Sequence, residues 1–466
     1  MFHSESGLKR IGYIVVMLCV LGGIISCKHS NGEHPPKITK VLLISIDTLR
    51  ADYLTPYDHN KNTSPNIDRF AKDNILFETV TSQAPSTAIS HKSILYSLYP
   101  AVHKLTKDSV PKETEQSPLQ ILQSKGFKTA AFVGGGQLSR KFGFARGFDS
   151  YWEAIRAEKD QPDTPEKKSG DRGHLKLIED NATKWLDNNY KENFFLFVHT
   201  YEVHCPYNPP KRYADKYTSW YKGDINPIGK CGDNYYNVQP MSQDDYRFVQ
   251  GLYSGSVNYV DEFIGRLIQK LKQLKIYDQT MIVFMADHGE SLGERTYVGH
   301  NLPYQVQLHI PLIMHIPGYE SDRIDQNAIA IDVMPTIFDV LGFAKAYPFQ
   351  GRSLIPVING STKIEKERVL ISEQKDRIRV RKGSWACIFS RIGDPREELY
   401  NVDKDPEETN NLASSKQDKV RELVRYYSKM LDASKPMSAR FVLDDQSRPE
   451  LDEATREQLK ALGYVQ

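Results

Sequence analysis

The segment Lys40-Val-Leu-Leu-Ile-Ser-Ile46 is a continuous run of apolar and β-branched residues that ends at Asp47. A run of this kind, without polar alternation, is typical of a strand that is buried on both faces of a parallel sheet. Similar runs occur at 129–133, 194–198, 281–286 and 311–316, and helical periodicity lies between them at 67–73, 180–188 and 246–274. Strands that alternate with helices over about 300 residues predict an α/β domain with a largely parallel central sheet flanked by helices.

The pattern changes after Gly351-Arg-Ser-Leu354. Short β-rich runs follow at 368–372, 377–381 and 385–390, and helical patterns at 416–431 and 453–462 close the sequence. These runs are divided by charged turns, which favours antiparallel pairing. We therefore expect a main domain at 39–350 and a smaller C-terminal α+β subdomain with an antiparallel sheet at 351–466.

The charge balance argues against large anionic partners. The chain has 61 basic and 59 acidic residues in 466, so it carries no broad basic field for nucleic acid or for an anionic membrane surface. A hydrophobic content of 39% is sufficient for a large buried core. Any charge that matters for function should therefore be local.

The first 27 residues have the features of an export signal. Lys9 and Arg10 precede an apolar run at 11–25, which is short for a transmembrane helix of about 20 residues. Ile24-Ile25-Ser26-Cys27 looks like a bacterial lipobox, in which Cys27 is lipidated. The sequence thus predicts a lipoprotein of the bacterial cell envelope, on its periplasmic or surface face, with a tether at 28–38. A plain cleaved signal or a short anchor is the alternative.

Three cysteines lie outside this signal: Cys205, Cys231 and Cys387. None forms a CxxC pair, so the sequence does not indicate a zinc site or thiol redox chemistry. In an oxidising compartment Cys205 and Cys231 can form a disulfide. Two free buried thiols are the alternative.

Polar residues with metal-binding chemistry follow two of the predicted strands. Asp47 follows the first strand, and Asp287-His288 follows the run at 281–286. In α/β sheets ligands collect at the carboxyl ends of the strands, and two carboxylates with an imidazole suit a divalent cation. A strand-end Asp is also common as a helix cap or a turn residue, so this pattern alone is a weak indication.

Several motifs in order make the sequence similar to the sulfatases of the alkaline phosphatase superfamily. Thr87-Ala-Ile-Ser-His91 has the register of the sulfatase signature C-x-P-S-R, and Pro100 follows Thr87 by 13 residues (100 − 87), as in that signature. The other matching segments are Ile46-Asp-Thr-Leu-Arg-Ala-Asp52, Thr63-Ser-Pro-Asn-Ile-Asp68, Phe197-Val-His-Thr-Tyr-Glu-Val-His-Cys-Pro-Tyr207, Ala286-Asp-His-Gly-Glu-Ser-Leu-Gly-Glu294, Gly299-His300, His309-Ile-Pro-Leu312, Asp332-Val-Met-Pro-Thr336, Gly351-Arg-Ser-Leu354 and Glu397-Glu-Leu-Tyr-Asn-Val-Asp-Lys-Asp-Pro406. The resemblance covers residues 39–466 and implies an alkaline phosphatase-like fold in which 39–350 is catalytic.

The resemblance also implies roles for individual residues. One divalent cation (Ca²⁺, Mn²⁺, Mg²⁺ or Zn²⁺) would be bound by Asp47, Asp287 and His288, with Thr87 Oγ as a further ligand and as a metal-activated nucleophile. A helix expected at 90–98, just after Thr87, would turn its free amides to an anionic substrate. His204 and His300 would contact the ester group or protonate its leaving oxygen. For each of them, a hydrogen-bonded structural role is the alternative.

Four further residues need a separate interpretation. His91 stands where the signature has Arg, and it can hold the nucleophile, bind the anion or be structural. His199 lies within a strand run, which favours packing over catalysis. No second metal site is expected, because Asp261 lies on a predicted helix with no His nearby, and solvation at the surface explains it better. Thr48 replaces the second Asp of the usual sulfatase opening.

Threonine at position 87 changes the expected mechanism. Sulfatases oxidise a Cys or Ser at this position to formylglycine, and threonine does not form that aldehyde. The resemblance therefore implies a sulfate ester hydrolase, or a related phosphate ester hydrolase, that works without formylglycine. The substrate would be a glycan or an envelope component. The alternatives are a phosphodiesterase or phosphotransferase that acts on a cell-envelope phosphoester, and a catalytically silent lipid-anchored binding protein.

Overall fold

The structure is a computed structural model that describes residues 37–111, 116–154, 174–225, 240–363, 367–392, 396–440 and 450–462. The predicted signal, most of the predicted tether and Cys231 lie outside these ranges. Cys205 is disulfide-bonded and Cys387 is a free, buried cysteine. Within the described ranges, no helix has the length and apolarity needed to cross a membrane.

The described part of the central sheet has nine strands, and eight of them follow in the order β10-β2-β9-β6-β1-β5-β3-β4, with β11 paired to β2. Their bounds are β1 Lys40–Ile46, β2 Ile75–Thr81, β3 Lys128–Val133, β4 Ser150–Glu153, β5 Phe194–Thr200, β6 Thr280–Ala286, β9 His309–His315, β10 Asp322–Ile324 and β11 Ala328–Ile329. β9 runs antiparallel to β2 and β6, and the remaining pairs are parallel. The predicted fold class, with a largely parallel sheet, is confirmed.

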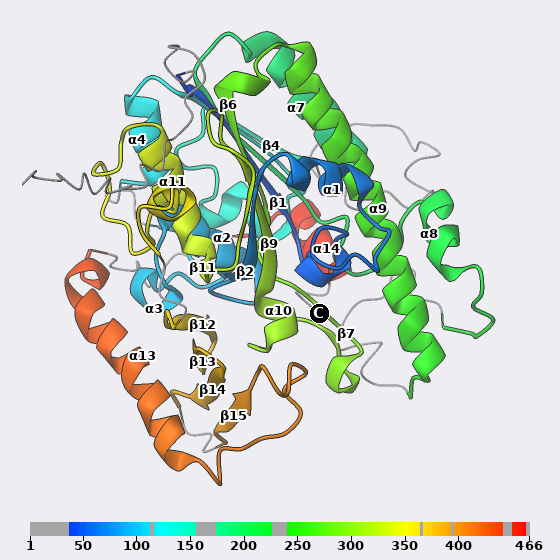
Figure 1. The fold of residues 1–466 in the computed structure, drawn as a ribbon. Helices are drawn as coiled ribbons and strands as arrows, with labels where there is room; N and C mark the ends of the chain where they lie inside the picture. Colours follow the sequence, from blue (N-terminus) through cyan, green and yellow to red (C-terminus); the bar gives the residue numbers. More distant parts are fainter. Residues whose placement is uncertain are drawn as a thin grey trace, which may run out of the picture. The chain divides into compact units, whose positions relative to one another are not determined.

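Helices lie on both sides of the sheet, as Figure 1 shows with α7, α9 and α1 on one side and α2, α4 and α11 on the other. Their bounds are α1 Pro65–Lys72, α2 Thr87–Tyr96, α3 Pro100–His103, α4 Pro118–Ser124, α7 Leu175–Asn189, α8 Lys211–Thr218, α9 Gln243–Gln273, α10 Gln305–Leu308, α11 Val333–Val340 and α12 Ile355–Ile358. All seven residues of β1 and of β6 are buried, as expected for strands between two helical layers.

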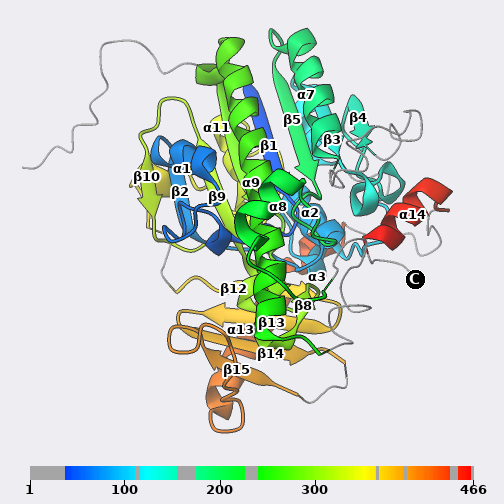
Figure 2. The same ribbon diagram turned by 90° about the vertical axis from the view of Figure 1, so that its right-hand side faces the viewer.

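The second sheet is antiparallel and has the order β12-β13-β14-β15. It consists of β12 Leu370–Gln374, β13 Arg377–Lys382, β14 Trp385–Ser390 and β15 Glu398–Asn401, and helix α13, Gln417–Ser438, packs on β13 and β14. This confirms the predicted antiparallel sheet. A further helix, α14 at Glu453–Ala461, lies beside the β3–β4 edge of the large sheet (Figure 2).

Two expectations about helices need correction. Helix α2 begins at Thr87 and not at Ser90, so Thr87 is its first residue. Asp261 on α9 is fully buried: its carboxylate accepts hydrogen bonds from the backbone amides of Asn66 and Ile67, at 3.1 and 2.8 Å. Because the first amides of a helix have no partner within it, Asp261 caps helix α1 from a distance and is not a surface residue.

Candidate active site

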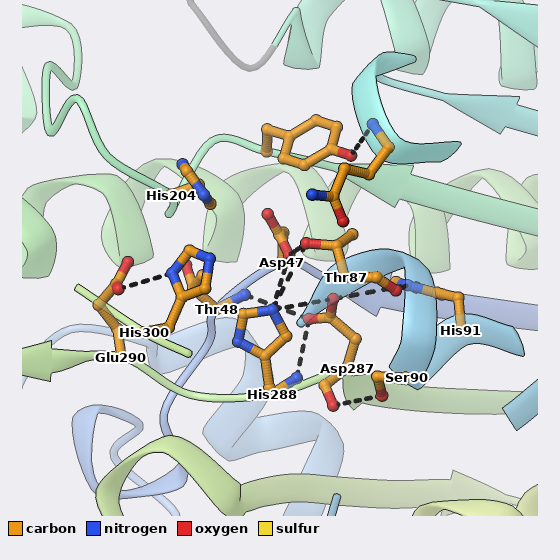
Figure 3. A network of polar contacts seen from close by, with 12 residues as sticks. Asp47, Thr48, Thr87, Ser90, His91, His204, Asp287, His288, Glu290 and His300 are labelled. Carbon is orange, nitrogen blue, oxygen red and sulfur yellow. Dashed lines mark hydrogen bonds and ion pairs between the residues drawn. The ribbon is translucent and has the colours of Figure 1, made fainter. Parts of the chain in front are cut away.

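The register of the two central strands brings the metal-binding candidates together. β1 and β6 pair in parallel with Ile46 opposite Ala286, so the next residues, Asp47 and Asp287, meet at the same edge of the sheet. Ligand atoms of Asp47, Asp287 and His288 lie within 4.8 Å of one another, and all three side chains are fully buried. Figure 3 shows these side chains around Thr87.

The donor atoms of this cluster fit a divalent cation. Asp47 Oδ2 and Asp287 Oδ2 are buried and have no hydrogen-bond partner. Since an unpaired buried carboxylate oxygen is costly, two of them side by side are suited to bind a cation. The imidazole of His288 donates from Nδ1 to the Gly289 carbonyl at 2.9 Å, which leaves the lone pair of Nε2 free for a ligand bond.

The two carboxyl groups have opposite pKa shifts. Burial, and then the negative charge of Asp287, raise the pKa of Asp47 well above its usual range. Burial acts in the same direction on Asp287, but the imidazoles of His288 and His91 outweigh it and lower its pKa. In the protein alone, one proton on Asp47 therefore relieves the repulsion between the carboxylates, and a cation can take the place of that proton.

Thr87 lies directly against this cluster. Its hydroxyl donates to Asp47 Oδ1 at 3.1 Å, and its Oγ lies 3.4 Å from Nε2 of His288. The next amide, that of Ala88, donates to the side chain of Gln137 at 3.0 Å. The amide of Ser90, the residue at which the helix was expected to begin with free amides, donates to the Ser86 carbonyl at 2.8 Å. Threonine at the start of α2 thus presents its hydroxyl to the paired carboxylates.

His91 lies behind Thr87 with both ring nitrogens hydrogen-bonded. Its Nδ1 donates to the Thr87 carbonyl at 2.8 Å, and its Nε2 is 3.0 Å from Ser45 Oγ. His91, His199 and Asp287 form a second cluster of the right size for a metal, but the proton on Nδ1 of His91 removes that nitrogen from the ligand set. The His91 geometry is that of a residue that holds helix α2 in place.

His199 lies within strand β5, as its position in the apolar run predicts. It is fully buried, and neither of its ring nitrogens has a hydrogen-bond partner. Its ring packs against those of His91 and Tyr201, at centroid distances of 5.0 and 4.8 Å. Burial, and then the neighbouring His91, lower its pKa well below the usual range, so this imidazole is neutral.

His204 and His300 lie on the other side of the cluster. Their ring centroids are 5.1 Å apart, and that of His300 is 4.7 Å from that of His288. Nδ1 of His204 contacts the Cys205 carbonyl, and burial followed by the proximity of His300 lowers the pKa of His204 to about 4. Nδ1 of His300 donates instead to the carboxylate of Glu290 at 2.9 Å. The two imidazoles therefore differ in their electrostatic environment.

Arg50 joins the two sequence motifs of the site. Its guanidinium pairs with Asp52 at 2.7 Å and Glu294 at 2.6 Å, and it donates to the Glu290 carbonyl at 3.0 Å. The charges that act most strongly on Asp47 and Asp287 in the described chain come from carboxylates and imidazoles, not from Lys or Arg. Arg50 thus fixes the segment that carries Glu290.

Two residues of the site were missed from the sequence. Glu290 lies within the segment Ala286–Glu294 quoted above. A search of that segment for an acidic partner of His300 would have identified it. Gln137 follows strand β3, whose carboxyl end was predicted. A glutamine after three glycines matches no motif that would mark it as a site residue. Its role depends on a contact with Ala88, 49 positions away in the chain.

Comparisons with known proteins agree with this architecture. Residues 39–343 match the family model described as Sulfatase, and residues 293–435 match the model described as N-sulphoglucosamine sulphohydrolase, C-terminal. An arylsulfatase of Clostridium perfringens is 23% identical over 458 residues, which cover 84% of this chain and 93% of the relative.

Two solved structures share the fold at low sequence identity. The phosphonate monoester hydrolase of Agrobacterium radiobacter aligns with a TM-score of 0.71 at 19% identity, over 90% of this chain and 98% of that one. A protein solved in complex with its substrate D-glucosamine-2-N,6-O-disulfate aligns with a TM-score of 0.68 at 18% identity, over 89% of this chain and 100% of that one.

Proposed function

Because the chain belongs to the sulfatase family, we propose that it hydrolyses a sulfate ester, or a related phosphate ester, with Thr87 as the nucleophile. The observation that carries this proposal is the hydroxyl of Thr87, which is 3.1 Å from Asp47 and 3.4 Å from His288 at the edge of the paired carboxylates. Asp47, Asp287 and His288 would hold one divalent cation, with Thr87 Oγ beside it. When bound, the cation supplies Lewis acidity that stabilises negative charge in the transition state.

The reaction has two steps. In the first step the Thr87 oxygen bonds to sulfur or phosphorus, and the bond from that atom to the leaving oxygen breaks. The Thr87 proton passes along its hydrogen bond to Asp47. The imidazolium of His300 gives a proton to the leaving alcohol. In the second step a water oxygen bonds to sulfur or phosphorus, the bond from that atom to the Thr87 oxygen breaks, and hydrogen sulfate or the corresponding phosphate leaves. The imidazole takes one proton from the water, and Thr87 recovers its own from Asp47.

We assign the proton donor for the leaving oxygen to His300. Its Nδ1 donates to the buried carboxylate of Glu290, which favours the charged form of the ring and fixes the orientation of the imidazole. His204 has a pKa lowered to about 4 and stays neutral near pH 7, which suits contact with the ester oxygens.

The charge of the site favours singly charged esters. A divalent cation would offset the two carboxylates of Asp47 and Asp287, and the charges that act most strongly on these carboxyls in the described chain come from no Lys or Arg. A sulfate monoester and a phosphodiester each carry one negative charge, whereas a phosphate monoester carries about two at neutral pH. The substrate alcohol would come from a sulfated glycan or an envelope component, in keeping with the disulfated sugar bound by one structural relative.

A second candidate function is that of a phosphodiesterase or phosphotransferase acting on a cell-envelope phosphoester. Threonine favours it chemically, because an ester on Thr87 has to be resolved by a second in-line attack, by water or by an acceptor alcohol. Similarity to a phosphonate monoester hydrolase supports the same class of chemistry. A catalytically silent binding protein is the third candidate.

One assay separates these candidates. The purified protein, with Mn²⁺, Zn²⁺, Ca²⁺ or Mg²⁺, is given an aryl sulfate, an aryl phosphodiester and an aryl phosphate monoester in parallel. Thr87→Val, which keeps the shape and removes the hydroxyl, should lower kcat at least about a thousandfold. The matched control is Thr81→Val, since the Thr81 hydroxyl is buried and has no hydrogen-bond partner. Turnover that survives Thr87→Val would exclude the nucleophile, and absence of both metal binding and turnover would favour the silent protein.

We also propose that the chain is an exported lipoprotein anchored at Cys27. The proposal is supported by Lys9 and Arg10 before the apolar run at 11–25 and by Ile24-Ile25-Ser26-Cys27 after it. In a bacterial host, incorporation of labelled fatty acid should be lost in Cys27→Ala and retained in Cys19→Ala. Labelling that persists in Cys27→Ala would contradict the lipid anchor.

A further inference from the structure

The side-chain NH₂ group of Gln137 lies in the site beside Thr87. Gln137 is only 3% exposed, and its Oε1 accepts a hydrogen bond from the amide of Ala88, the residue after Thr87, at 3.0 Å. Because Oε1 is engaged, Nε2 of the same carboxamide points away from Ala88. It has no hydrogen-bond partner among the described residues, and it is not one of the atoms sealed inside the protein. A neutral donor is therefore available next to the proposed nucleophile.

The loop that carries Gln137 is held by a helix more than 300 positions further along the chain. Gln458 on α14 donates from Nε2 to the carbonyl of Gly134 at 2.8 Å, and its Oε1 accepts from the amide of Gly136. One side-chain amide thus binds a donor and an acceptor of the same loop. Gln458 is itself 9% exposed, so these bonds are sheltered from water.

Tyr201 holds the loop from the opposite side. Its hydroxyl accepts from the backbone amide of Gln137 at 3.1 Å and donates to the carbonyl of Gly135 at 3.2 Å. A Cβ atom on Gly134 would lie 2.7 Å from the Tyr201 ring, and one on Gly136, where φ is +56°, would lie 3.0 Å from Leu462. The loop is therefore packed between Tyr201 and the α14 segment, with no room for side chains at these glycines.

We propose that Gln137 binds the ester group of the substrate, donating from Nε2 to a non-bridging oxygen, and that Gln458 is a positioning residue that acts through Gln137. This inference rests on the proposed function of Thr87. Gln137 orients the ester toward the Thr87 hydroxyl without adding charge. Gln458 fixes the backbone of the Gly134–Gln137 loop, and so fixes the carboxamide relative to helix α2.

A double-mutant cycle on the full chain tests this relationship. Gln137→Met and Gln458→Met each keep the shape of the side chain and remove its hydrogen bonds. Each variant should lower kcat/KM for the best aryl ester, and the affinity for inorganic sulfate measured by calorimetry, by about tenfold. Because Gln458 acts through Gln137, the double variant should be no worse than Gln137→Met alone.

Two further variants separate positioning from a loss of stability. Gln458→Glu keeps the acceptor for Gly136 but loses the donor to Gly134, so its sulfate affinity should lie between those of wild type and Gln458→Met. Glu457→Ala, an exposed neighbour on α14, should leave it unchanged. Losses that multiply in the double variant would overturn the proposal, as would a Gln458→Met that lowers only the melting temperature. Sulfate affinity requires no turnover, so these outcomes remain distinct from a failure of the proposed catalytic function.

Discussion

Nδ1 of His300 donates a 2.9 Å hydrogen bond to the carboxylate of Glu290, and both side chains are buried. Burial raises the pKa of Glu290 to about 7, although the nearby imidazoles of His204 and His288 oppose this shift. The carboxylate fixes the ring orientation of His300 and determines which of its nitrogens carries the proton. A substitution of Glu290 therefore tests the role of His300.

Glu290→Gln should reduce kcat about 10- to 100-fold with little change in KM, because the neutral amide no longer favours the charged ring of His300. The loss should grow as the leaving phenol of the aryl ester becomes more basic, since a poor leaving group needs the proton most. Glu179→Gln is the control, as Glu179 is a buried carboxylate that pairs with Arg266 far along the chain. A loss that is equal for all leaving groups would remove the proton-donor assignment from His300.

Asp47→Asn should stabilise the protein in the presence of a chelator while it abolishes cation binding. The substitution removes one of two buried, adjacent carboxylates, and this should raise the free energy of unfolding by about 1–3 kcal/mol. Thermal unfolding measures both effects, because an added cation raises the melting temperature only of a protein that binds it. Asp52→Asn should have the opposite sign, since it breaks the ion pair with Arg50. If, in the presence of the chelator, Asp47→Asn has a lower melting temperature than the wild type, this account would be contradicted.

Asp261→Ala should destabilise the fold by about 1–3 kcal/mol, because it removes the acceptor from the buried amide of Ile67 and the partly buried amide of Asn66. Asp261→Asn keeps an acceptor oxygen and should cost less. Chemical denaturation at constant pH compares the three proteins. Equal effects of Ala and Asn would mean that the carboxylate does not cap helix α1.

The stability of the wild type relative to Asp261→Asn should fall as the pH rises from 4 to 7. Burial raises the pKa of Asp261 from 3.8 to about 6, even though its hydrogen bonds with Ile67 and Asn66 act in the opposite direction. A raised folded-state pKa contributes stability that is present below the unfolded value and is lost as the pH passes the folded value. The expected change is at most about 3 kcal/mol. A difference that is constant over this range would show that Asp261 titrates normally.

The sequence indicated the strands with long apolar runs most accurately. The segment 385–390 was predicted to the residue, and 194–198 was two residues shorter than β5. Strand β2, Ile75–Thr81, was missed because its continuous apolar run ends after three residues, at Phe77, and a bulge interrupts its pairing between Phe77 and Val80. Strand β9 was predicted from its apolar run, but its antiparallel direction is not encoded in such a pattern.

The sequence also indicated which site residues follow a strand, because their position depends on a local pattern. Asp47, Asp287 and His288 were of this kind. The partners of His91 and His300, and the contacts of Gln137, depend on segments that meet only in the folded chain. The same reason explains why Asp261 was misjudged: a single acidic residue in a helical pattern does not reveal that another helix begins against it.

The pairing of Ile46 with Ala286 has a consequence for how this site can diverge. The spacing of Asp47 and Asp287 follows from the separation of neighbouring strands, about 4.8 Å, and not from the loops around them. Mutations that reshape the surrounding loops can therefore accumulate over evolution and alter what the protein accepts, while the two carboxylates keep their separation. The innermost backbone hydrogen bonds of the sheet preserve the geometry of the two carboxylates, and the outer segments remain free to change.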